Sequence, residues 1–120
     1  MKLNPVLHEE AYAFAAVDDG LAVKLMPDAV CVFKEAEGAT IVLPESDAAK
    51  HGLSFGFRAA WITLAAETSL DGLGITAAFS KVLADNGISC NVFAPIHHDH
   101  IFVPFDKGAE AVRLLAGIDI

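Results

Sequence analysis

The clearest alternation of apolar and polar stretches lies in the second half of the chain. A continuous apolar run from Arg58 to Glu67 has the length of one strand and the composition of a strand that is buried on both faces. The glycine-containing segment 68–74 interrupts this run and predicts a loop. Beyond it the apolar positions switch to helical spacing, and Asn86-Gly87 follows as a stop, with Gly87 in the left-handed position of a helix end. The residues that form this helical stripe are Ile75, Ala78, Phe79, Val82 and Leu83.

Two more strands and a helix are predicted after this stop. Segments 88–96 and 101–105 have strand composition, and the four polar residues between them have the length of a hairpin loop. Asp106 is expected to cap a final helix that ends before Gly117. Residues 59–118 therefore predict the order strand, helix, strand, strand, helix, which is most of a split βαβ, or ferredoxin-like, unit.

The first half of the chain shows a weaker version of the same order. Tyr12, Phe14 and Ala16 alternate in a short strand that Asp18-Asp19-Gly20 ends, while segment 21–27 fits a strand and a helix equally well. The remaining elements are a strand at 29–34, a turn with Gly38 at positive φ, a strand at 40–43 and about two helical turns within 44–52. We expect an α+β protein of two units with antiparallel sheets, a reduced one over residues 1–58 and a fuller one over 59–120.

Composition and charge exclude several classes of function. Hydrophobic residues make up 54% of the 120 residues and charged residues 20%, which excludes a disordered chain and leaves apolar groups for a subunit interface. The formal charge of −8, with eight scattered Lys and Arg, excludes a nucleic-acid or anionic-membrane surface. No signal or membrane-spanning segment is apparent. Cys31 and Cys90 are expected to be buried reduced thiols in a cytoplasmic protein.

Three strings give the sequence a resemblance to a known family. Segment 33–43, segment 69–78 and the run His98-Asp-His-Ile-Phe-Val-Pro104 resemble small bacterial proteins built from tandem ACT-like domains, over most of the chain from Tyr12 to Leu115. The resemblance implies two ferredoxin-type ACT units that dimerise and a regulatory role in which an amino acid or a similar metabolite is bound. Pro95 departs from the family pattern, where a small residue is common, and its fixed φ stiffens the backbone before the hairpin.

The loop 68–74 is the best candidate for a ligand site. A loop that contains glycines and leads into a helix presents free N–H groups and the positive end of the helix dipole, which suits the carboxylate of an amino acid. The resemblance implies the same place, because this strand-to-helix loop lines the effector site of ACT domains. An ordinary helix start capped by Ser69 or Asp71 is the alternative. The candidate ligand-binding residues are Thr68, Ser69, Leu70, Asp71, Gly72, Gly74 and Ile75, with Asn91 on the neighbouring strand.

The polar turn His97, His98, Asp99 and His100 invites a metal interpretation. Imidazole and carboxylate suit zinc or nickel, but along an extended backbone these side chains alternate between two faces, so one chain offers two ligands a face. A polar hairpin is the simpler interpretation, and we expect no metal and no other cofactor.

The sequence favours regulation over catalysis. It has no nucleophile elbow, no phosphate-binding loop and no dinucleotide fingerprint. A thiol nucleophile at Cys90 would lie in an apolar strand, where burial makes a thiol inert. We expect a non-catalytic protein that senses a small ligand, with a structural or protein-interaction module and a metal-binding protein as alternatives.

Overall fold

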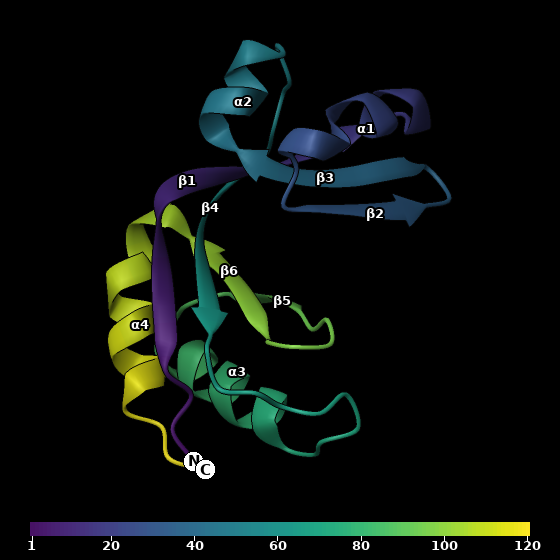
Figure 1. The fold of residues 1–120 in the computed structure, drawn as a ribbon. Helices are drawn as coiled ribbons and strands as arrows, with labels where there is room; N and C mark the ends of the chain where they lie inside the picture. The colour runs from purple at the N-terminus through teal and green to yellow at the C-terminus, as the bar shows by residue number, and fades with distance from the viewer. The chain divides into compact units, whose positions relative to one another are not determined.

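The computed structural model describes all residues from Met1 to Ile120 (Figure 1). The chain forms two units. Unit 1 contains Met1–Glu9 and Ala60–Ile120, and unit 2 contains Glu10–Ala59. Two long strands, β1 (Pro5–Val17) and β4 (Phe57–Leu64), contribute residues to both units.

Unit 2 has every element of a ferredoxin-like βαββαβ unit. Its strands follow the order β2-β3-β1-β4, and β3 pairs antiparallel with both β1 and β2. The helices α1 and α2 lie on the same side of β2 and β3 (Figure 1), where Leu25 and Ala48 join the core. The elements are the second half of β1, α1 (Asp19–Leu25), the 3-10 helix η1 (Met26–Asp28), β2 (Cys31–Glu35), β3 (Gly38–Pro44), α2 (Glu45–Lys50) and the first residues of β4.

Local side-chain chemistry explains the helix at 19–25. Asp18 is the N-cap of α1, and its carboxylate accepts a hydrogen bond of 2.8 Å from the amide of Leu21. The segment for which the sequence left strand and helix open is therefore helical, and it buries Ala22 and Leu25. Asp18, expected only to end a strand, both ends β1 and starts α1.

Unit 1 has the same strand order in a permuted chain. Its strands follow the order β1-β4-β6-β5, so the first residues of the protein supply the edge strand that would otherwise follow the last helix. Its elements after β4 are α3 (Ile75–Asp85), β5 (Asn91–Phe93), β6 (His100–Pro104), the 3-10 helix η2 (Phe105–Lys107) and α4 (Gly108–Ala116).

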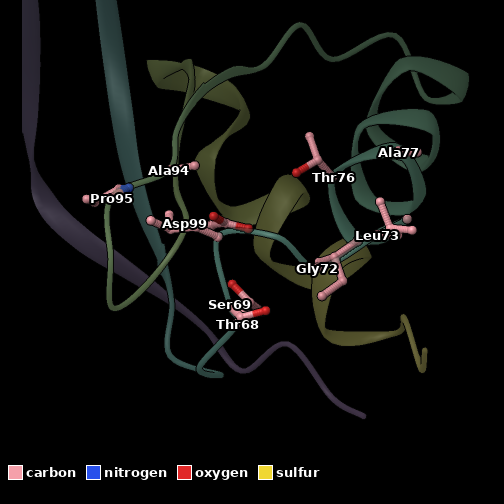
Figure 2. Close-up of a pocket in the computed structure, with 12 residues that line it drawn as sticks. Thr68, Ser69, Gly72, Leu73, Thr76, Ala77, Ala94, Pro95 and Asp99 are labelled. Carbon is pink, nitrogen blue, oxygen red and sulfur yellow. The ribbon is translucent and has the colours of Figure 1, made fainter.

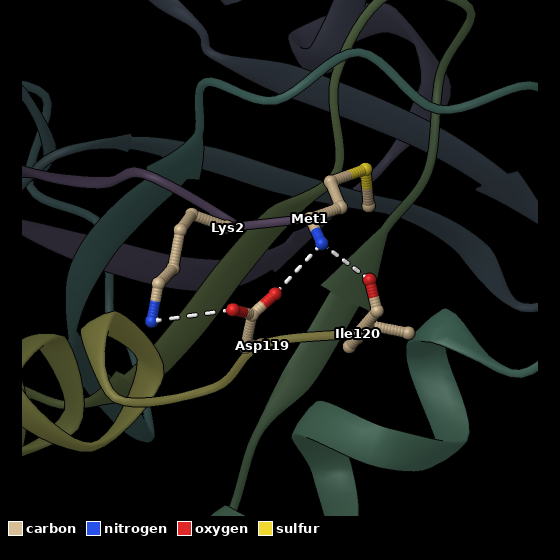
Figure 3. Close-up of polar contacts among 4 residues, drawn as sticks. All are labelled: Met1, Lys2, Asp119 and Ile120. Carbon is tan, nitrogen blue, oxygen red and sulfur yellow. Dashed lines mark hydrogen bonds and ion pairs between the residues drawn. The ribbon is translucent and has the colours of Figure 1, made fainter.

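The two chain ends meet in unit 1, as the permuted order requires. The N-terminal ammonium donates to a carboxylate oxygen of Asp119 at 2.7 Å and also to the carbonyl oxygen of Ile120 (Figure 3). The amide of Ile120 donates to the carbonyl oxygen of Met1 at 2.9 Å, and Lys2 Nζ lies 3.8 Å from Asp119. These contacts are exposed, so we assign them a role in alignment of the ends and little net stability.

The core of unit 1 lies between its sheet and the helices α3 and α4. Along β4 the side chains alternate, so that Ile62 and Leu64 enter this core whereas Trp61 and Thr63 point to the opposite face of the sheet. Leu3, from the first residues of the chain, is only 1% exposed and belongs to the same core. The other fully buried members include Phe79, Leu83, Ile101, Val103, Ala111 and Leu115.

Several predicted boundaries were wrong. The strand predicted at 88–96 is shortened to β5, because Ile88 donates to the carbonyl oxygen of Leu83 and so completes the end of α3, with Gly87 at φ +75°. The first strand is much longer than the alternating residues indicated. Asp106 lies inside η2 and does not cap α4, whose N-cap is Lys107.

Candidate functional site

A pocket opens in unit 1 where the loop after β4 meets the start of α3 (Figure 2). Its volume is about 230 Å³, which is room for a small metabolite. Three segments line it: the loop 68–74, the first turn of α3, and the connection between β5 and β6. The lining residues are Thr68, Ser69, Leu70, Gly72, Leu73, Gly74, Ile75, Thr76, Ala77, Ala94, Pro95 and Asp99.

The start of α3 is not capped by any side chain. Its N-cap is Gly74, in the left-handed conformation at φ +88°, and the hydroxyl of Ser69 donates to Asp71 at 2.8 Å instead of accepting from the helix. The first amide of this turn with a partner is that of Ala78, which donates to the carbonyl oxygen of Gly74. The amides before it, those of residues 75–77, therefore offer free donors at the positive end of the helix dipole.

Asp99 brings a carboxylate to the same pocket. It is only 7% exposed, which makes it the one charged residue of the chain that is buried. Its backbone carbonyl accepts a hydrogen bond from the amide of Leu64 at 2.9 Å, which ties this residue to the end of β4. Its side chain has no hydrogen bond and no ion pair within the chain, and it lies among the lining residues, opposite Thr76 (Figure 2).

Most of the predicted ligand-binding residues lie together. Asp71 and Asn91 do not line the pocket: Asp71 is engaged with Ser69, and Asn91 is exposed at the start of β5. Sequence reasoning did not place Asp99 at this pocket, because the residue was considered only as a metal ligand or as part of a polar hairpin. The six predicted residues that do line the pocket are Thr68, Ser69, Leu70, Gly72, Gly74 and Ile75.

The histidine turn does not gather into a metal site. No group of three or more His, Cys, Asp or Glu side chains is placed to hold a metal ion. The side chains diverge: His97 is exposed, Asp99 faces the pocket, and His100 belongs to β6 and contacts Trp61. His98 is partly buried, and its Nδ1 atom has no partner.

A second polar cluster lies on the face of the unit 1 sheet opposite the helices. The ring of His8 stacks on Trp61 with 3.6 Å between the ring centroids. The indole N–H of Trp61, which can only donate, points to His100 Nδ1 at 3.0 Å, so this nitrogen is the acceptor and the ring proton sits on Nε2. The Thr63 hydroxyl, 3.0 Å from the same nitrogen, then donates to it and accepts from His8 Nε2 at 2.8 Å.

This cluster requires an unprotonated Nδ1 atom on His100, and stability is expected to fall on acidification. Burial lowers the pKa of His8 and of His100 below 6.5; for His100 the neighbouring His98 and His8 lower the pKa further, while Asp99 raises it. Because the unfolded chain then takes up protons first, the free energy of unfolding decreases as the pH falls below about 6.5 and levels off below the folded pKa values. Urea unfolding followed by Trp61 fluorescence between pH 8 and 5 measures this slope.

The matched variants for this prediction are His100→Asn, which keeps an acceptor but cannot titrate, and His97→Asn on the exposed turn. We expect the first to flatten the pH dependence and the second to leave it unchanged. Equal slopes in the wild type and His100→Asn would contradict the assignment of the acceptor.

Both cysteines are free thiols. Cys31 and Cys90 are half-buried, and burial raises the pKa of each thiol, which keeps it protonated and poorly nucleophilic at neutral pH. Among the helices none has both the length and the apolar character needed to cross a membrane.

Comparison with known proteins covers the whole chain. An ACT domain family model matches residues 1–60, and a second ACT domain model matches residues 57–117. No match was found among curated proteins.

Solved structures show the same fold. A Vibrio cholerae protein of unknown function, described as a possible transport protein, is 37% identical with a TM-score of 0.90 over 100% of this chain and 92% of its own. The Agrobacterium tumefaciens protein Atu0741 is 18% identical with a TM-score of 0.77 over 97% and 88%. The regulatory subunit of aspartate kinase from Thermus flavus is 11% identical with a TM-score of 0.65 over 93% and 94%. The two family models and the two ferredoxin-like units agree, and the chain belongs to the ACT domain family, with two ACT domains in tandem.

Proposed function

We propose that this protein is a non-catalytic regulatory ACT protein that binds a small amino acid in the pocket at the start of α3. The observation that carries the proposal is the open pocket itself, which is lined by uncapped amides of α3 and by the loop 68–74. Backbone N–H groups at a helix start suit a carboxylate because they combine free donors with the positive end of the helix dipole. The fold shared with a regulatory subunit of aspartate kinase supports the regulatory role.

Apolar side chains would complete the site. Leu70, Leu73 and Ile96 are 69%, 94% and 69% exposed, and all three lie on the loops that form or flank the pocket. Side chains of this kind at a pocket rim are candidates for closure over a ligand or for contact with a second subunit. The proposal therefore includes a homodimer. It also includes a cytoplasmic location and two ACT sequence regions, 1–58 and 59–120, of which the first lends its initial residues to unit 1.

Such a sensor works by a shift in the populations of two subunit arrangements. An amino acid changes the arrangement of the subunits only if it binds one arrangement better than another. No catalytic group is needed for this, because the output is the surface that the favoured arrangement presents to a partner.

The proposal predicts that at least one of the twenty amino acids raises the melting temperature in a thermal-shift screen. With free ligand at 100 times its dissociation constant, the expected stabilisation is about 2.7 kcal/mol. Thr76→Trp, which places a large ring in the lined space, should abolish the shift, whereas Lys81→Trp on the exposed face of the same helix should keep it.

Two outcomes count against the proposal. The absence of any shift at millimolar ligand would favour a structural or protein-interaction module. A shift that survives Thr76→Trp would place the ligand elsewhere in the protein.

A further inference from the structure

The carboxylate of Asp99 has no hydrogen-bond or ion-pair partner in the fold, although the residue is almost entirely buried. A charged group removed from water is costly unless an opposite charge or hydrogen-bond donors compensate for it. Asp99 is 7% exposed and has no hydrogen-bond donor or ion-pair partner within the chain, so only the water of the open pocket, or a ligand bound there, can compensate for its carboxylate. No Lys, Arg or His forms an ion pair with Asp99, and the Nδ1 atom of the neighbouring His98 is itself buried without a hydrogen-bond partner.

The direction of Asp99 shows where compensation has to come from. The residue lines the pocket together with the first turn of α3, and Figure 2 shows its carboxylate turned toward Thr76 across the lined space. A ligand in the pocket therefore meets an anion on one side and free amide donors on the other. No Lys or Arg lines the pocket to offset the carboxylate.

From this arrangement we infer that Asp99 selects the ligand by its protonated amine, so that the pocket accepts α-amino acids with uncharged side chains and rejects acidic amino acids and ligands without an amine. The inference rests on the proposed function and deepens it. The ligand carboxylate lies against the amides of α3, and the ammonium group pairs with Asp99 in a charge-assisted hydrogen bond. Leu70, Ala94 and Pro95 supply apolar surface for the uncharged side chain, beside the hydroxyl-bearing residues Thr68 and Ser69.

The rejection of acidic amino acids and of ligands without an amine follows from the same electrostatics. The second carboxylate of aspartate or glutamate would enter a small pocket that already holds one buried anion and offers no cation to either. A 2-hydroxy acid retains the carboxylate contact with α3 but leaves Asp99 without a positive partner. Loss of a charged partner of a buried group corresponds to a decrease in affinity of about 10- to 100-fold.

The test is isothermal titration of the wild type with three matched pairs of ligands: alanine and lactate, valine and 2-hydroxyisovalerate, phenylalanine and 3-phenyllactate. Aspartate and glutamate complete the set. We expect at least one neutral amino acid to bind about 10- to 100-fold more tightly than its hydroxy acid, and no heat of binding from aspartate or glutamate.

Two variants separate the role of the carboxylate from its effect on folding. Asp99→Asn should bind the amino acid about 10- to 100-fold more weakly and should bind the hydroxy acid at least as well as the wild type does. Asp106→Asn makes the same change of charge at an exposed residue of unit 1, and its affinities should match those of the wild type. If Asp99→Asn does not fold, the paired ligands on the wild type still decide the question.

The two proposals fail in different ways. Equal affinity of the wild type for an amino acid and its hydroxy acid, or amino-acid binding unchanged by Asp99→Asn, overturns the selectivity of Asp99 and leaves the pocket as an amino-acid site. If none of the twenty amino acids binds the wild type, the proposed function is overturned, and the inference about Asp99 falls with it.

Discussion

Leu3→Ala is expected to destabilise unit 1 by about 2–5 kcal/mol, the usual cost of a buried Leu truncated to Ala. Leu3 is 1% exposed in the core that α3 and α4 cover, although it lies next to an exposed terminus. The substitution removes apolar contacts and leaves a cavity, while the backbone carbonyl of Leu3 can still accept from the amide of Ala66.

Urea unfolding followed by fluorescence of Trp61 measures the effect, because this sole tryptophan lies in unit 1. Val6→Ala is the matched control. Val6 lies nearby in β1 and is 52% exposed, and we expect this substitution to change the free energy of unfolding by less than about 1 kcal/mol. A loss of less than about 1 kcal/mol for Leu3→Ala would show that the first residues are not part of the core of unit 1.

Gly38→Ala is expected to destabilise unit 2 by at least about 2 kcal/mol. Gly38 begins β3 after the turn from β2 and has φ +138°, a conformation that residues with a side chain rarely adopt. A Cβ atom at this position would lie 2.9 Å from the carbonyl oxygen of Val17 in the neighbouring strand β1. The nearest atoms all belong to the backbone of Val17 and Asp18, so no flexible side chain could move away.

Far-UV circular dichroism during urea unfolding, with hydrogen exchange of the β2 and β3 amides, reports on this unit. Gly56→Ala supplies the comparison, because a Cβ at Gly56 meets nothing within 4 Å and the residue is not at positive φ. We expect that control to change stability by less than about 1 kcal/mol in either direction. Equal effects of the two substitutions would mean that the β2–β3 turn tolerates a side chain.

The order of elements in the second half was predictable because each element carried its own local signal. Both ends of α3 were predicted: its start by the apolar stripe from Ile75, and its end by the Asn86-Gly87 stop. Extents of strands were less predictable. Strand β1 is 13 residues long, but only its second half alternates visibly, because its first half is an edge segment whose side chains are mostly exposed.

The permuted order of unit 1 could not be predicted from local pattern. It depends on the pairing of the first residues with β4 and on the meeting of Met1 with Asp119, and neither leaves a periodic signal in the sequence. The resemblance to ACT domains gave the fold class, and the family models confirm it.

Only the part of the candidate site that lies in the loop before α3 was predictable from the sequence. A glycine-containing loop before a helix is a local feature, so Thr68–Gly74 and Ile75 could be identified from the sequence alone. Asp99 reaches the pocket from a distant connection between strands, and its burial depends on the tertiary structure. In the sequence, a single acidic residue among histidines indicates a metal site or a polar turn, and nothing local indicates that it binds an ammonium group.

The central claim is that an amino acid docks on the first turn of α3, and a ¹⁵N-resolved NMR titration tests it most directly. Addition of the amino acid found in the screen should shift the amide signals of Ile75, Thr76 and Ala77 with a single saturable affinity, since these are the donors that the carboxylate would engage. Saturable shifts confined to other parts of the protein, with these three signals unmoved, would contradict the account.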